Sequence, residues 1–136
     1  MSKLTISVAI KAPIEKVWDK MNNPEDIEQW NTASEDWHCP KAENNLTIGG
    51  SLKSTMAAKD GSFSFEFEGI YDEIIPNKLI RYHLGDQRSV EIRFEEIGNE
   101  VIVTETFDAE SQNPIEMQQQ GWQAILNNFK KHVELI

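Results

Sequence analysis

One carboxylate occupies a position where it could orient a ligand or take part in chemistry. Val101, Val103, Glu105 and Phe107 alternate along one run, so they share one face of a predicted strand. If the valines face the interior, Glu105 does too, and an interior carboxylate needs a partner or a raised pKa. The functional interpretation makes Glu105 a hydrogen-bonding group for a ligand or a general base. We favour the structural alternative, in which a cross-strand Arg or Lys pairs with Glu105, or the intervening threonines face inward instead.

His83 and Arg81 are weaker candidates on another predicted strand, at residues 79–84. They share one face with Leu79, and Ile80, Tyr82 and Leu84 take the other. Alternation alone leaves open which face is inside. We expect Arg81 and His83 to face solvent, and His83 ranks second to Glu105 as an acid–base group.

Metal binding and nucleophilic catalysis have little support. His38 and Cys39 are adjacent, so their side chains point apart, and no second spaced pair accompanies them. The sequence has no Gly-x-Ser-x-Gly elbow and no phosphate loop, and Gly49-Gly50 reads as a turn. We therefore expect no metal, no cofactor and no covalent intermediate.

Large aromatic side chains are the main candidates for contact with a small molecule. Trp18 lies on the apolar side of a short predicted helix and is assigned to the core. The others either line a pocket, which is mostly apolar in proteins, or simply fill the core. Together with Glu105, the predicted ligand-binding residues are Trp30, Trp37, Phe65, Phe67, Tyr82, Trp122 and Phe129.

Composition limits the classes of partner. The chain has 136 residues, with 39% hydrophobic and 26% charged, which is typical of a folded globular domain rather than a disordered chain. The net charge of −10 repels nucleic acid and anionic membrane surfaces. The single cysteine excludes an internal disulfide, and no apolar run resembles a signal peptide or a spanning helix. We expect a cytoplasmic protein.

The elements that would position these residues follow from periodicity and turn residues. Alternation over residues 3–11 predicts a strand, and helical spacing predicts short helices over 13–21 and from Asn23 to about Trp30. Residues 31–50 read as irregular, apart from a short strand near Trp37. Compact turns then separate strands at 51–57, 63–74, 79–84, 89–97 and 100–107, followed by a helix over 114–135.

Short connections join antiparallel neighbours, because parallel pairing would need long crossovers. The order of elements therefore predicts an α+β fold in one domain, residues 1–136. A twisted sheet that curves around the long C-terminal helix would bury both elements best. Apolar residues recur along that helix at Ile115, Trp122, Ile125, Phe129, Val133 and Ile136.

Several segments resemble a known superfamily. The run Ile10–Trp18 is similar to the opening of the SRPBCC, or START-like, superfamily, and within it to bacterial homologues of the activator of heat-shock-protein-90 ATPase. Further matching features are Trp30, Gly49-Gly50, the runs 67–76 and 103–107, and Gly121-Trp122. The resemblance implies a helix-grip fold of the START/Bet v 1-like kind, with a ligand cavity between sheet and long helix.

Three functions are compatible with these features. We favour a non-enzymatic binder of a small apolar or amphipathic molecule, held by apolar burial and oriented by a few polar groups. The first alternative is an enzyme of the polyketide cyclase or hydrolase kind that uses an inward carboxylate. The second, implied by the resemblance, is a chaperone-associated interaction protein of the stress response.

Overall fold

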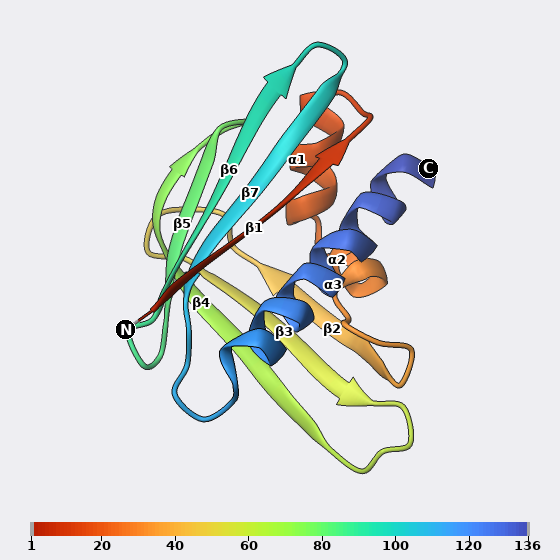
Figure 1. The fold of residues 1–136 in the computed structure, drawn as a ribbon, viewed down its shortest axis with the longest axis vertical. Helices are drawn as coiled ribbons and strands as arrows, with labels where there is room; N and C mark the ends of the chain where they lie inside the picture. The colour runs from red at the N-terminus through yellow and green to blue at the C-terminus, as the bar shows by residue number, and fades with distance from the viewer. Residues whose placement is uncertain (1, 136) are drawn as a thin grey trace.

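The computed structural model describes residues 2–135, so Ile136 lies outside the described part of the chain. Strands and helices follow the predicted α+β order (Figure 1). They are β1 (Lys3–Ile10), α1 (Ile14–Asn22), α2 (Pro24–Trp30), β2 (Trp37–Asn44), β3 (Ser51–Ala58), β4 (Ser64–Ile75), β5 (Leu79–Leu84), β6 (Ser89–Ile97), β7 (Glu100–Asp108) and α3 (Ile115–Leu135). None of these helices is long and apolar enough to cross a membrane.

The prediction for residues 31–50 was wrong in one respect, because β2 is a full strand of eight residues. Its pairing with β3 shifts register between His38 and Lys41. The two buried side chains, Cys39 and Ala42, therefore lie three positions apart instead of two. The irregularity removes the strict alternation by which a strand is recognised in a sequence.

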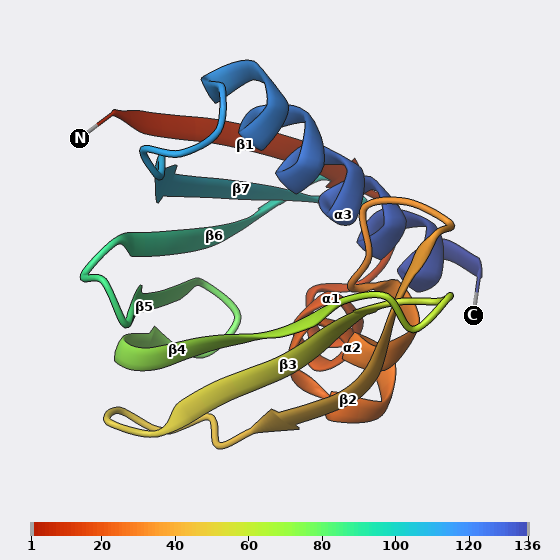
Figure 2. The same ribbon diagram turned by 90° about the horizontal axis from the view of Figure 1, so that it is seen from below.

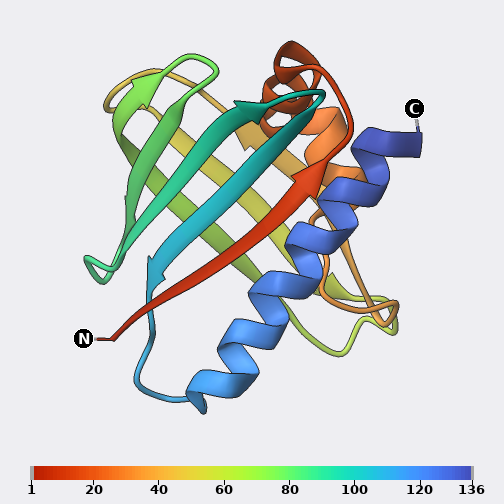
Figure 3. The ribbon, with the colours of Figure 1, turned by 45° about the horizontal axis from the view of Figure 1, so that its top comes forward.

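One seven-stranded sheet has the order β1-β7-β6-β5-β4-β3-β2, with every pair of neighbours antiparallel. The sheet curls into a half-barrel, and Figure 2 shows its strands stacked in this order from β1 at the top to β2 at the bottom. Helix α3 runs across the open side beside β1, and α1 and α2 cover one end (Figure 3). This arrangement is the predicted helix-grip fold.

Polar contacts fasten α3 to the rest of the molecule along its C-terminal half. His132 Nε2 lies 2.8 Å from Asp26 Oδ1 on α2, and both side chains are largely buried. Lys130 Nζ donates to the Ala9 carbonyl of β1 at 2.6 Å. Asn128 donates to the Thr32 carbonyl that follows α2. The helix is therefore held by β1 on one side and by α2 and the segment after it on the other.

The core fills the space between α3 and the concave face of the sheet. Its most deeply buried side chains include Val101, Val103 and Phe107 of β7 and Phe129 of α3. They are apolar, as burial without hydrogen bonds requires. Glu105 interrupts the apolar inner face of β7, because strand geometry points it to the same side as Val103 and Phe107.

Candidate functional site

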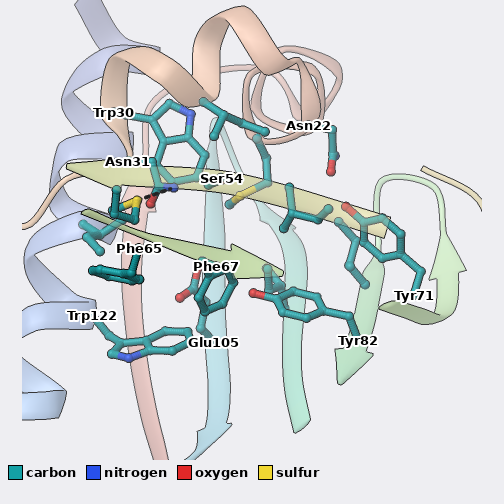
Figure 4. A pocket seen from close by; sticks show the side chains of 17 residues that line it. Asn22, Trp30, Asn31, Ser54, Phe65, Phe67, Tyr71, Tyr82, Glu105 and Trp122 are labelled. Atoms are coloured by element: carbon teal, nitrogen blue, oxygen red, sulfur yellow. Dashed lines mark hydrogen bonds between the residues drawn. The ribbon is translucent and has the colours of Figure 1, made fainter. Parts of the chain in front are cut away.

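A cavity of about 160 Å³ lies between the concave face of the sheet and α3 (Figure 4). Strands β3 to β7 supply its floor, and the ends of α1 and α2 close one side. It is lined by Met21, Asn22, Ile27, Trp30, Asn31, Leu52, Ser54, Met56, Phe65, Phe67, Tyr71, Ile80, Tyr82, Ile92, Glu105, Trp122 and Ile125. The wall is predominantly apolar and aromatic, as in most small-molecule sites.

Glu105 lies on this wall without a partner. Its cross-strand neighbours are Ile6 on β1 and Ile92 on β6, neither of which carries a charge or a hydrogen-bonding side chain. Within residues 2–135 the carboxylate makes no hydrogen bond, and burial alone raises its pKa from 4.5 to about 7. The surface that Glu105 retains borders the cavity. The favoured expectation of an Arg or Lys partner was wrong, because strand pairing surrounds Glu105 with isoleucines.

Tyr82 places a second polar group at the cavity. Its side chain is buried, and desolvation together with the charge of Glu105 raises the pKa of its hydroxyl well above 10. No side chain or backbone group of the described chain hydrogen-bonds this hydroxyl. In Figure 4 it points toward Phe67 and Glu105.

Gly69 on β4 allows Tyr82 this position. A Cβ atom at Gly69 would lie 2.5 Å from Tyr82 Cδ2, so any larger residue would displace the ring. A glycine inside a strand often marks such a close approach. Gly69 is thus a positioning residue for the Tyr82 ring.

Aromatic rings surround the two polar groups. Trp122 on α3 stacks on Phe107, with ring centroids 3.9 Å apart and planes 10° from parallel. Phe67 meets the rings of Tyr82 and Trp122 edge-on at 6.3 and 6.1 Å. Trp30 enters from α2, and its indole N–H donates to the Lys20 carbonyl at 3.0 Å. These contacts fix the ring planes around the cavity.

Other polar groups at the wall are satisfied by the protein itself. The Tyr71 hydroxyl donates to Asn44 Oδ1 at 2.6 Å, and Asn44 donates to the Asn22 carbonyl at 2.8 Å. The Asn22 amide donates to the Trp18 carbonyl. Unlike the polar groups of these three residues, those of Glu105 and Tyr82 remain available to a molecule in the cavity.

The structure brings most of the sequence-predicted residues together at this cavity. Trp30, Phe65, Phe67, Tyr82, Glu105 and Trp122 line it, and their contact with a ligand stays a prediction. Two residues require correction, since neither is among the described residues that line the cavity. Phe129 is fully enclosed in the core, where its ring packs against Trp30 at 5.0 Å. Trp37 packs outside the cavity against Phe63 and Phe65.

Residues of several kinds were missed from the sequence. Gly69 carried a usable signal, a glycine in the middle of a strand. Ser54 and Asn31 carried none, because small polar residues are common on exposed surfaces. Apolar residues such as Leu52, Met56 and Ile125 could not be separated from core residues, because lining a cavity and filling a core require the same side chains.

The remaining candidates lie away from the cavity. Arg81 pairs with Glu73 and Glu91 on the outer face of the sheet, as expected from the sequence. His83 Nδ1 lies 2.9 Å from Asp72 on that same face. Burial raises the pKa of the Cys39 thiol, which disfavours the reactive thiolate. Within the described chain, no group of three or more His, Cys, Asp or Glu residues could hold a metal ion.

Fold and cavity together define a helix-grip protein of the START-like class. The sequence matches the family model described as Activator of Hsp90 ATPase homolog 1-like protein over residues 11–134, and the chain belongs to this family. The resemblance inferred from sequence motifs is therefore confirmed. The fold that the family shares is that of ligand-binding domains.

Solved structures of similar proteins have the same fold as this chain. The AHSA1-like protein from Aeromonas hydrophila is 40% identical, with a TM-score of 0.92 over 98% of this chain and 93% of that one. Chr148 from Cytophaga hutchinsonii is 50% identical, with a TM-score of 0.85 over 98% and 92% of the two chains. CV1439 from Chromobacterium violaceum, at 22% identity and a TM-score of 0.87 over 98% and 99%, shares the fold. No protein with a curated functional description matches the sequence.

Proposed function

We propose that this protein binds a small amphipathic molecule in the cavity between the sheet and α3, without transforming it. The observation that carries the proposal is an aromatic-lined cavity of about 160 Å³ with two polar side chains that have no hydrogen-bond partner among residues 2–135. Every fully buried side-chain N or O atom of the described residues has a hydrogen-bond partner, so the unpaired oxygens of Glu105 and Tyr82 are accessible from the cavity. Polar groups that the protein leaves unpaired at a cavity wall are sites for a ligand or water. Apolar burial would supply affinity, and Glu105 and Tyr82 would orient the ligand.

Compact ring compounds test the proposal directly. An apolar cavity of about 150 Å³ in another protein holds benzene, so toluene, benzyl alcohol and benzylamine are suitable probes. We expect at least one of them to raise the Tm and to shift the indole N–H resonances of Trp30 and Trp122 in a saturable way. Saturable shifts confined to other parts of the molecule, or no shift with any probe, would contradict the proposal.

A cavity-filling substitution provides the matched control. Ile125→Trp adds volume to the wall from α3, whereas Asn127→Trp adds the same side chain at an exposed position of the same helix. We expect Ile125→Trp to abolish the response to the probes and Asn127→Trp to retain it. Equal responses of both variants would place the probes elsewhere.

A second candidate function is acid–base catalysis by Glu105. A carboxyl group whose pKa is raised to about 7 exchanges a proton readily near neutral pH, as a general acid or base must. The two candidates differ in the fate of the bound molecule. Mass spectrometry of metabolites incubated with the protein should show a cavity ligand recovered unchanged, whereas conversion that Glu105→Gln abolishes would favour the enzyme.

A third candidate is contact with a chaperone, suggested by the name of the family. Trp37, Phe63 and Phe65 form an aromatic cluster with ring centroids 6.0–6.1 Å apart, and Phe63 is 60% exposed. Exposed apolar clusters often mark protein interaction sites. Binding of a purified bacterial heat-shock-protein-90 homologue that Phe63→Ser weakens would support this function, and the absence of binding would remove it.

A further inference from the structure

We infer that the cavity selects a compact organic cation, an amine attached to an apolar body about the size of one six-membered ring. This inference rests on the proposed function and adds the chemical class of the ligand. Three features of the cavity carry it: the sign of its charge, the aromatic faces around that charge, and its volume.

The charge of the wall is negative. Glu105 is the acidic residue, and no Lys, Arg or His occurs among the described residues that line the cavity. A carboxylate or phosphate group of a ligand would therefore enter without a counter-ion and beside Glu105, which is strongly unfavourable in a desolvated site. An ammonium group would instead supply the hydrogen-bond donors and the positive charge that Glu105 lacks.

Aromatic rings around Glu105 favour a cation further. Phe67, Tyr82 and Trp122 form a connected set, with Phe67 in contact with each of the other two. These rings line the same cavity as the Glu105 carboxylate, and Trp30 lies on the opposite side of it (Figure 4). Ring faces carry negative electrostatic potential and attract ammonium groups, a contact that gains strength when water is excluded. The Tyr82 hydroxyl can accept a hydrogen bond from the same ammonium group.

The volume limits the apolar body. A cavity of about 160 Å³ accommodates a benzene-sized ring with a short substituent, because a cavity of about 150 Å³ is enough for benzene. A long acyl chain or a sterol exceeds this space. The size and the charge together separate the proposed ligand from fatty acids and phospholipids.

Protonation of Glu105 gives the selection a pH dependence. Its pKa of about 7 leaves the carboxylate increasingly neutral in more acidic solution, so amine affinity should fall by about tenfold per pH unit below 7. The other titratable groups on the wall are the hydroxyls of Tyr71 on β4 and Tyr82 on β5, and burial raises both pKa values above 10. Lining residues from α1, α2 and α3 carry no titratable group.

The test compares three probes of similar shape with the wild-type protein at pH 8, using isothermal titration calorimetry. Benzylamine is cationic, toluene is neutral and benzoate is anionic. We expect benzylamine to bind at least about tenfold more tightly than toluene, and benzoate to show no binding. If toluene binds as tightly as benzylamine, the inference fails and the proposed function stands. If no probe binds, both fail.

Two variants that each remove one negative charge test whether Glu105 is the residue that favours the cationic probe. Glu105→Gln should reduce benzylamine affinity at least about tenfold and leave toluene affinity unchanged, because the two side chains have the same shape. Glu95→Gln removes the same charge at an exposed position of β6 and should change neither. Retained preference for benzylamine in Glu105→Gln would overturn the assignment. The wild-type probe series needs no substitution, so it remains decisive if a variant folds poorly.

Discussion

Two carboxylates on the same strand behave in opposite ways. Asp108 and Glu105 lie three residues apart on β7, so they face opposite sides of the sheet. Asp108 accepts hydrogen bonds from Lys3 Nζ at 2.8 Å and from the Ser89 backbone N–H at 2.8 Å, and these contacts lower its pKa from 3.8 to about 2. Glu105 faces the cavity and has no hydrogen-bond partner in the described part of the chain, and burial raises its pKa to about 7.

The contrast shows that burial without a hydrogen-bond partner distinguishes a candidate binding carboxylate from a structural one. Around Asp108, the protein supplies every donor the carboxylate needs. Around Glu105, it supplies isoleucines and aromatic rings, which offer the carboxylate no hydrogen bond and therefore favour its neutral, protonated form. A ligand can supply the hydrogen-bond donors that Glu105 lacks, whereas the donors of Asp108 are already provided by the protein.

The largest expected effect comes from removing the charge of Glu105. Because its folded-state pKa of about 7 exceeds the ordinary 4.5, the folded chain holds a proton between these values that the unfolded chain has lost. Stability therefore falls as pH rises through 4.5 to 7. We expect Glu105→Gln to be about 2–3 kcal/mol more stable than wild type at pH 8 and nearly equal at pH 4.5.

Urea denaturation at the two pH values measures this difference. Glu95→Gln is the control, because it makes the same substitution at an exposed position of β6. Equal stabilities of Glu105→Gln and wild type at pH 8 would mean that Glu105 has the same environment as an exposed glutamate, and the contrast with Asp108 would disappear.

Removing the Tyr71 hydroxyl should change the free energy of unfolding less than Glu105→Gln does. In Tyr71→Phe, the half-buried Asn44 loses the hydrogen bond that its Oδ1 accepts at 2.6 Å. We expect a loss of about 1–2 kcal/mol in the free energy of unfolding, measured by urea denaturation. An unchanged free energy of unfolding would show that water can replace the Tyr71 hydroxyl as the donor to Asn44. The Tyr71 hydroxyl would then contribute no more to stability than the Tyr82 hydroxyl.

Asp108→Asn should cost about 1 kcal/mol at pH 7, a small value because Lys3 is 60% exposed and water screens the ion pair. The folded-state pKa of about 2 is below 3.8, so the contribution of Asp108 is present above 3.8 and is lost as pH falls toward 2. Thermal unfolding between pH 2 and 7 should therefore show variant and wild type converging in acid. A gap that is constant across this range would contradict the role assigned to the carboxylate charge.

Tyr82→Phe should have the smallest effect, under about 0.5 kcal/mol, because the hydroxyl has no hydrogen bond in the described chain to lose. Tyr71→Phe serves as the control for Tyr82→Phe, since both substitutions remove one hydroxyl from the wall of the same cavity. A loss above about 1 kcal/mol in urea denaturation would reveal a bound water or partner at Tyr82.

Much of the fold could be predicted, since strand and helix periods and turn residues are local properties of the chain. The β5 and β6 ranges were predicted to the residue, and α3 differs by one residue at its start. β2 was underestimated because its register shift interrupts alternation. At Gly121 in α3, a Cβ atom would meet no neighbour within 4 Å, so packing does not require a glycine at this position.

For the candidate site, the sequence by itself determined which side chains share a face: alternation put Glu105 beside Val103 and Phe107. Only the tertiary structure decided that this face is internal, that isoleucines flank Glu105 on both neighbouring strands, and that the nearest rings leave about 160 Å³ open. The physical reason is that register and sheet curvature arise from contacts between distant segments. Those contacts determine whether an inward carboxylate is paired, as first expected, or left available to a ligand.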